Sequence, residues 1–112
     1  MIIINGIKYP VKTGYGTIYL FCVKKKIEFG DFIDRVSAYN FDKITNEFID
    51  DMAEFVLCCI ERCGNNDLPS KYDVLDWMLE NHYEEVFSLF NESLGLRAGV
   101  KKENTKKKKI LR

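Results

Sequence analysis

Cysteine is the residue type here with the widest chemical repertoire, and three of the four cysteines lie within six positions of one another. Cys59 and Cys63 are four residues apart, so on a helix they would share one face and could ligate the same metal ion. Cys58 would point elsewhere, no CxxC pair occurs, and the single histidine, His82, lies in another part of the chain. A zinc site needs four protein ligands, or three and a water. We therefore interpret all four, including Cys22, as reduced thiols that behave as small apolar residues.

The other groups with catalytic potential lack the partners that they would need. His82 could act as a general base only beside a positioned nucleophile or acid, and its polar neighbours are typical of a surface or helix-capping position. Residues 14–17, Gly-Tyr-Gly-Thr, continue into neither GxGxxG nor GK[ST], so a strand-to-helix turn is favoured over a phosphate loop. Adjacent carboxylates such as Asp50-Asp51 diverge by about 100° on a helix and usually mark its solvated face. The sequence thus predicts no catalytic residues, no metal site and no cofactor, and we expect a protein that is not an enzyme.

The aromatic residues are more informative than the ionisable ones. Eight Phe, six Tyr and one Trp exceed what the core of so short a chain requires. Trp77, Tyr83, Phe87 and Phe90 lie in the last apolar-periodic region. Because exposed aromatic patches mark protein contacts, we predict that these four contribute to a protein-binding surface. A Phe-rich core is the alternative interpretation, and the sequence leaves both open.

Length and hydropathy limit the architecture. With 112 residues, 46% of them hydrophobic, the chain can form one domain with one core. No apolar run approaches the roughly 18 to 20 residues that span a bilayer, and residues 1–6 lack the charged start of a signal peptide. We expect a single globular domain over residues 1–97 that neither enters a membrane nor is secreted.

The net charge of zero conceals a strong asymmetry. From Ala98 onward seven basic residues stand against Glu103 alone, which gives +6, and residues 1–97 therefore carry −6. The lysines of this segment are Lys101, Lys102, Lys106, Lys107, Lys108 and Lys109. We predict that residues 98–112 form a disordered basic tail, because they hold too little apolar surface to become ordered. The acidic body repels phosphate backbones, so nucleic acid is expected to bind weakly, and through the tail alone.

Hydrophobic periodicity predicts an α+β, mainly α fold, in which an N-terminal β-hairpin packs on a small bundle of about four helices. Residues 2–12 form the predicted hairpin, with Asn5-Gly6 as a strong two-residue turn signal. Helices are expected at about 17–26, 29–38, 45–63 and 71–94. The 45–63 segment carries two adjacent apolar rows, which indicates the central helix of the fold. The sequence leaves open whether 71–94 is one kinked helix or two.

Polar residues support several of these helix boundaries. Thr17 and Thr45 are candidates for the N-cap positions of the first and third helices. Ser70 followed by Asp73 resembles a capping box with Asp in place of Glu. Gly64 supplies a residue that tolerates the left-handed conformation in which many helices end.

Four segments of this sequence occur in an order that is found together in one protein family. They are an ING-x-x-Y-x-V-K-x-G hairpin at residues 4–14, a helix that opens after Gly14-Tyr15-Gly16, an F-x-D-x-M-A-E-F start to the central helix within residues 48–60, and an acidic-aromatic final region at residues 74–94. This combination resembles the tail assembly chaperones of long-tailed bacteriophages. In one respect the chain departs from the family, which often ends its first helix with E-E-x-G where this chain has Lys24-Lys25-Lys26.

The resemblance implies a non-enzymatic role in phage tail assembly. Such chaperones keep the tape measure protein soluble, in the cytoplasm of the bacterial host, while tail tube subunits assemble around it. The expected partners are therefore a tape measure protein and a tail tube protein, and homo-oligomer formation stays open. Genes of this family often use a −1 ribosomal frameshift near their 3′ end, and the run 106–109 is what an A-rich slippery sequence would encode.

Two other functions compete with this one. The first is a small nucleic-acid-binding accessory protein that acts through the basic tail, with a helix-turn-helix among residues 45–94. Acidic residues such as Asp73, Asp76 and Glu80 would then face phosphate, which argues against it. The second is a structural tail component, which would remain in the finished particle.

Overall fold

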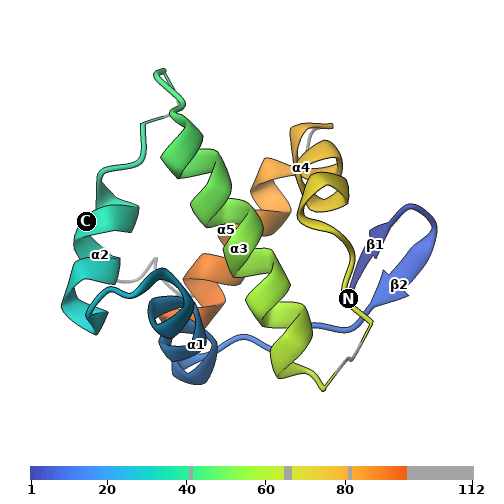
Figure 1. Ribbon diagram of the computed structural model, residues 1–112, viewed down its shortest axis with the longest axis horizontal. Coiled ribbons are helices and arrows are strands. Elements are labelled where there is room, and N and C mark those ends of the chain that lie inside the picture. The colour runs from blue at the N-terminus through green and yellow to red at the C-terminus, as the bar shows by residue number, and fades with distance from the viewer. Residues whose placement is uncertain (41, 65–66, 81, 96–112) are drawn as a thin grey trace, which may run out of the picture.

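A long helix passes through the middle of the molecule, and the other elements pack around it (Figure 1). In the computed structural model, which describes residues 1–40, 42–64, 67–80 and 82–95, the elements are β1 (Ile2–Ile4), β2 (Ile7–Tyr9), α1 (Tyr15–Lys25), α2 (Phe29–Ser37), α3 (Asn46–Arg62), α4 (Lys71–Leu79) and α5 (Tyr83–Ser93). The central helix is α3, and α1, α4 and α5 all pack against it. The fold is α+β and mainly α, as predicted, while the predicted tail at 98–112 lies outside the described residues.

The N-terminal hairpin forms around the predicted turn. Asn5 and Gly6 have φ values of 55° and 78°, and positive φ at both central positions is what a type I′ turn requires. The two strands are antiparallel, with Ile2 opposite Tyr9. Ile2, Ile4 and Tyr9 are buried, and β1 contacts α4. The strands stop at Tyr9, before Pro10, because proline has no N–H to donate to the ladder.

The first helix begins two residues earlier than predicted. Gly14 is its N-cap residue, with a φ of 126° that favours glycine. Thr17 is therefore not a cap: it is buried within α1, and its hydroxyl donates to the Lys12 carbonyl at 2.7 Å. The helix ends where Lys26 adopts a left-handed conformation.

The remaining helix boundaries follow the predicted polar residues closely. Thr45 caps α3 by accepting a hydrogen bond from the Phe48 N–H at 3.1 Å. Ser70 caps α4 in the same way through the Asp73 N–H, also at 3.1 Å. Residues 71–94 form two helices, because α4 ends at Leu79 and α5 begins only after His82.

Phenylalanine rings from four different helices meet in the centre of the core. Phe21 of α1 and Phe32 of α2 pack edge to face, with ring centroids 5.5 Å apart. Phe55 of α3 and Phe90 of α5 stack at 4.2 Å. The four rings have under 2% of their surface exposed, so each helix is fixed to the others by a large buried apolar side chain.

A buried carboxylate joins the three helices α1, α2 and α3. Asp51 of α3 is completely buried and accepts hydrogen bonds from Arg35 Nε at 2.7 Å, from Arg35 Nη2 at 3.1 Å and from the Tyr39 hydroxyl at 2.9 Å. Lys25 Nζ lies 3.1 Å from Asp51 Oδ1, the oxygen that also accepts from Arg35 Nη2. Burial, with the neighbouring Asp51 charge, raises the pKa of Tyr39 well above its usual value, so its hydroxyl stays protonated and donates.

Replacing this carboxylate should weaken the whole fold. We expect Asp51→Ala to lower the free energy of unfolding by about 3 kcal/mol, because Arg35 and Lys25 lose their shared counter-charge in a buried site. The measurement is urea denaturation followed by circular dichroism. Asp50→Ala is the matched control: Asp50 also pairs with Lys25, but its side chain is 41% exposed, so a loss of about 1 kcal/mol or less is expected. Equal losses would contradict the role assigned to Asp51.

Candidate functional site

The four aromatic residues predicted to form a protein-binding surface do not lie together at the surface. Trp77 and Phe90 are buried, with 5% and 1% of their surface exposed. Tyr83 and Phe87 are half-buried and pack against the edge of the core. The prediction is therefore corrected for Trp77 and Phe90, which belong to the core because α4 and α5 both pack against α3.

A different set of apolar residues is exposed, on the outer side of α1 and α2. We call it the α1–α2 face, and its members are Tyr15, Tyr19, Val23, Phe29 and Ile33. Tyr19 is the most exposed of them, at 68%. The rings of Tyr15 and Phe29 have centroids 6.1 Å apart, which joins the row on α1 to the row on α2. Large exposed apolar residues in contact with one another are typical of protein-binding surfaces.

Helical periodicity explains how the chain builds this face. On α1 the buried residues Ile18, Phe21 and Cys22 form one side, while Tyr15, Tyr19 and Val23 recur every four residues on another. On α2 the buried Phe32 faces the core, and Phe29 and Ile33, four residues apart, remain outside. Each helix therefore carries apolar residues on two sides, although the core takes up just one of them.

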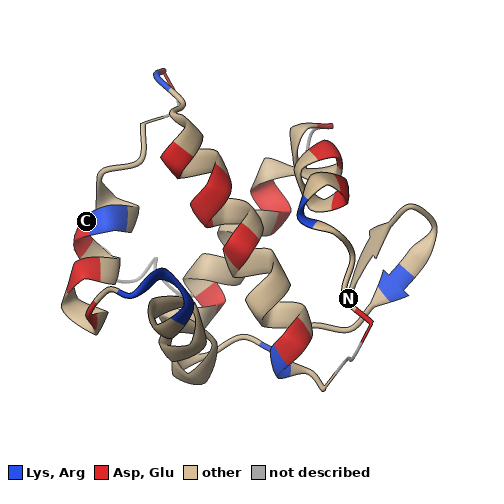
Figure 2. Cartoon of the chain, in the orientation of Figure 1, with Lys and Arg blue, Asp and Glu red and all other residues tan. Residues whose placement is uncertain are grey.

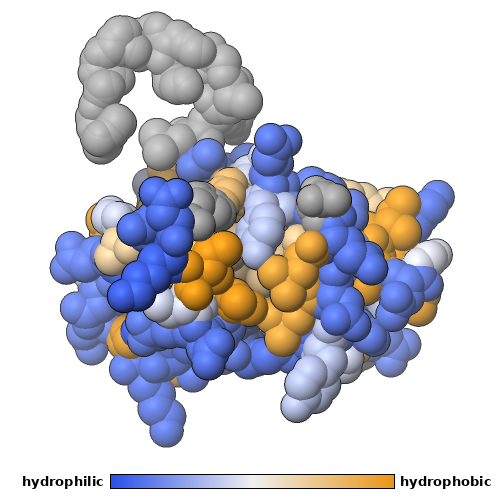
Figure 3. All heavy atoms as spheres, turned by 90° about the horizontal axis from the view of Figure 1, so that it is seen from above, coloured by the Kyte–Doolittle hydropathy of each residue, from blue (hydrophilic) through white to orange (hydrophobic). Residues whose placement is uncertain are grey.

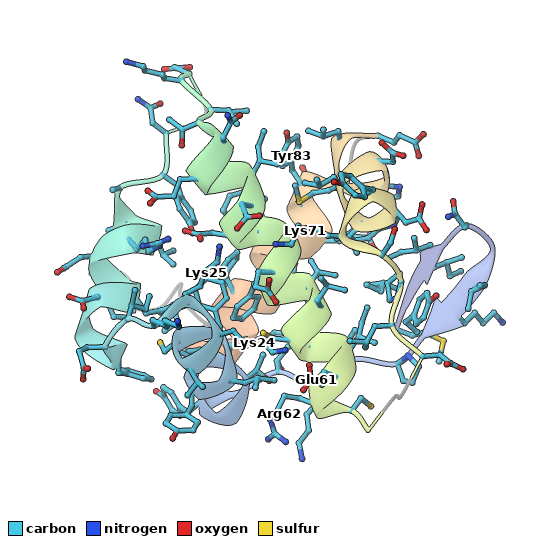
Figure 4. All side chains as sticks on the ribbon, viewed as in Figure 1. Lys24, Lys25, Glu61, Arg62, Lys71 and Tyr83 are labelled. Atoms are coloured by element: carbon cyan, nitrogen blue, oxygen red, sulfur yellow. The ribbon has the colours of Figure 1, made fainter. Side chains whose placement is uncertain are left out.

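Charged residues anchor the two helices beside this face. Lys24 Nζ lies 3.0 Å from Glu61 Oε1 of α3 (Figure 4). Lys25 pairs with Asp50 and Asp51. Glu28 and Asp31 form a reciprocal capping box at the start of α2. Figure 2 shows basic residues gathered at the C-terminal end of α1 and acidic residues along α2. Lys24 and Lys25 thus pair with acidic residues of α3 and hold α1 against the central helix.

The glycines that suggested a phosphate loop have structural roles. Gly14 supplies the positive φ at the start of α1. A Cβ atom at Gly16 would lie 2.7 Å from Arg62 Nη2, so glycine leaves room for the Arg62 side chain (Figure 4). Gly14 thus belongs to the predicted strand-to-helix turn, whereas Gly16 lies within α1 and packs against Arg62.

Three of the four thiols have the properties of core residues. Cys22, Cys58 and Cys59 are buried, whereas Cys63 is exposed. Burial, with the nearby Glu54 charge, raises the pKa of the Cys58 thiol to about 12, which keeps it protonated and unreactive. Among the described residues no group of three or more His, Cys, Asp or Glu side chains could hold a metal ion. His82 stacks on Trp77 with ring centroids 4.8 Å apart and contacts Glu85, as suits a helix junction.

A second apolar surface lies between α3 and α4. A cavity of about 210 Å³ there is lined by Asn46, Ile49, Asp50 and Leu75, and we call it the α3–α4 groove. Figure 3 views the molecule from the side on which α3 begins and shows apolar areas near the centre of that face with a shallow hollow between them. In Figure 4 Tyr83 lies between α3 and α4 in the view.

Comparison with known proteins found no match, whether with family models, with curated proteins or with solved structures. Within the described residues, no helix is both long and apolar enough to cross a membrane.

The sequence analysis did not predict the α1–α2 face, although the spacing of its apolar residues indicates it. Tyr15, Tyr19 and Val23 have helical spacing, but a helix that starts at Thr17, as the sequence predicts, leaves Tyr15 outside it. A start at Gly14 adds Tyr15 to the row and gives α1 two apolar sides instead of one. A helix with an apolar second side is the pattern that indicates a partner beyond the core.

The α1–α2 face should contribute little to folding. We expect Tyr19→Lys to change the free energy of unfolding by no more than about 0.5 kcal/mol, because the side chain is mostly in water. Phe21→Ala, two positions away and fully buried, should lower it by about 3–5 kcal/mol. Urea denaturation of both variants measures the difference. A large loss for Tyr19→Lys would show that this side of α1 is packed and unavailable to a partner.

Proposed function

We propose that this chain is a non-enzymatic assembly chaperone that binds the tape measure protein of a long-tailed phage in the cytoplasm of the bacterial host. The tail tube protein is the second proposed partner. The observation that supports the proposal most directly is the α1–α2 face, where aromatic and aliphatic side chains are exposed together on an acidic body. The resemblance of residues 4–94 to phage tail assembly chaperones supplies the identity of the client.

The physical requirements of such a chaperone fit this surface. A long helical client exposes apolar stripes, and an amphipathic helix binds to a partner surface through apolar residues about one helical turn apart. Tyr15, Tyr19 and Val23 present apolar groups at that spacing. The charge of −6 on residues 1–97 keeps the bound client from aggregating, because like-charged complexes repel one another.

The decisive experiment is co-expression of the full chain with the long reading frame expected to lie downstream. We expect the client to be soluble only in the presence of this chain and to co-purify with it. The double variant Tyr19→Lys/Phe29→Ser should weaken binding about thirtyfold, since two contact residues worth about 2 kcal/mol together are lost. Soluble client yield and binding measured by light scattering provide the readout.

Tyr72→Lys is the matched control for this experiment. Tyr72 is 79% exposed but lies on α4, away from the α1–α2 face. Tyr72→Lys makes the same substitution as Tyr19→Lys and adds the same charge. Because Tyr72 lies away from the α1–α2 face, the yield of soluble client should be unaffected. If the client stays insoluble with the wild-type chain, or if both variants bind as well as the wild type, the proposal is wrong.

Two results would favour the alternative functions instead. Retention of DNA at low salt that disappears when residues 98–112 are deleted would favour the nucleic-acid-binding protein. Recovery of the chain in purified virions would favour a structural tail component.

A further inference from the structure

The part of the α1–α2 face that α1 contributes is a row of three residues, arranged evenly about its middle member. Tyr15, Tyr19 and Val23 follow one another at intervals of four, so Tyr19 has an exposed apolar neighbour about one turn away on each side. One neighbour is a large ring and the other is a small aliphatic group. A two-fold axis beside Tyr19 would therefore place Tyr15 of each copy against Val23 of the other, a large side chain against a small one.

Rows of this spacing are the ridges along which helices in globular proteins pack most often. Residues four apart form a ridge inclined to the helix axis, and two helices whose ridges of this kind interdigitate cross at about 50°. Under a two-fold axis, the ridge on α1 lies alongside the same ridge of a second copy that runs in the opposite direction. The row thus fits a copy of itself without any change in the fold.

The second helix of the face widens the row. Phe29 of α2 contacts Tyr15, with ring centroids 6.1 Å apart, and Ile33 follows one turn further along α2. Both side chains remain partly exposed. In a symmetric pair, the rings of Tyr15 and Phe29 would flank Val23 of the other copy, so both helices contribute to the contact.

The exposed area is what a small reversible interface needs. A fully enclosed aromatic side chain buries about 200 Å², and Tyr15, Tyr19 and Phe29 are 63%, 68% and 44% exposed. Their exposed parts amount to about 350 Å² in each copy, or about 700 Å² in a pair. Val23, Ile33 and the side chains around them raise this total to roughly 1,000 Å², the lower limit for specific association. Since permanent dimers bury about 2,000 Å² or more, a dimer of this size should dissociate on dilution.

Charge on the face does not oppose the association of two copies. Its tyrosine, valine, phenylalanine and isoleucine side chains are uncharged at neutral pH. Lys24, which follows Val23, has Glu61 as a counter-charge 3.0 Å away, and Lys25 pairs with acidic residues of α3. A strongly charged partner such as nucleic acid has no counterpart among the five members of the face, whereas a second copy of the same face does.

We propose that two copies of this chain associate through the α1–α2 face, around a two-fold axis that passes beside Tyr19. The dimer covers the exposed aromatic rings while no client is bound, and a client replaces the second copy on the same surface. This competition rests on the proposed function, whereas the dimer itself requires no client.

Sedimentation velocity of the full chain tests the dimer. Between about 5 µM and about 500 µM we expect a reversible rise from monomer towards dimer. Tyr19→Lys should weaken the dimer at least about tenfold, because the axis brings the two added charges close together. Tyr72→Lys is the matched control: Tyr72 is also largely exposed but lies on α4, across α3 from this face (Figure 1). This variant should sediment like the wild type.

A charge-swap experiment tests the position of the axis. A residue beside a two-fold axis meets its own copy, so Tyr19→Glu alone should dimerise as weakly as Tyr19→Lys. An equimolar mixture of these two variants should form a heterodimer, because a lysine and a glutamate then lie opposite each other. Circular dichroism checks that both variants are folded. The same pair of substitutions at Tyr15 is the register control and should give no rescue, since residue 15 faces residue 23 of the other copy.

Three results would overturn the inference. A chain that stays monomeric up to about 500 µM would leave the face to the client alone. A dimer that Tyr19→Lys does not weaken would use another surface. Rescue at residue 15, or no rescue at residue 19, would show that the axis does not pass beside Tyr19. These measurements contain no client, so the dimer can fail while the chaperone proposal stands, and an insoluble client leaves the dimer result unchanged.

Discussion

The buried carboxylate of Asp51 is the constraint on which the arrangement of α1, α2 and α3 depends. A charged group without exposed surface is stable only if its partners satisfy it, and here they come from two other segments, Arg35 with Tyr39 and Lys25. Because each partner must reach the same two oxygens, the ion cluster fixes where α1 and α2 can lie. Apolar packing of Phe21 and Phe32 fills the space beneath them but is less directional.

The exposed aromatic surface is a consequence of that arrangement. Once Arg35 and Phe32 hold α2 against the rest of the fold, Phe29 and Ile33 have no core position to occupy and remain in water. Tyr15 meets Phe29 across the two helices, so the exposed rings support each other although neither is buried. The molecule therefore divides its aromatic residues into an inner set that stabilises the fold and an outer set that is available to a partner.

Local signals in the sequence predicted the elements well, but they did not predict which side of a helix is covered. Asn5-Gly6, Thr45 and Ser70 act through their own backbone neighbours, so their roles could be read from position alone. Trp77 and Phe90 required knowledge of which helix lies opposite, which periodicity does not contain. For the same reason the sequence did not predict the α1–α2 face. It did not predict the Asp51 cluster either, because the partners of Asp51 lie 12 to 26 positions away from it in the chain and share no motif with it.

The junction between β2 and α1 is tied to the last turn of α5. The Gly14 N–H donates to the buried Ser93 hydroxyl at 3.1 Å, across a sequence separation of 79 residues. The first helix therefore lacks one of its N-terminal partners until the final helix has been synthesised. Because contacts between distant residues cannot form until both ends are present, the domain completes its fold only after nearly the whole chain has left the ribosome. A shortened or stalled product that ends before Ser93 would expose the start of α1 and the apolar residues beneath it to the quality-control machinery of the cell.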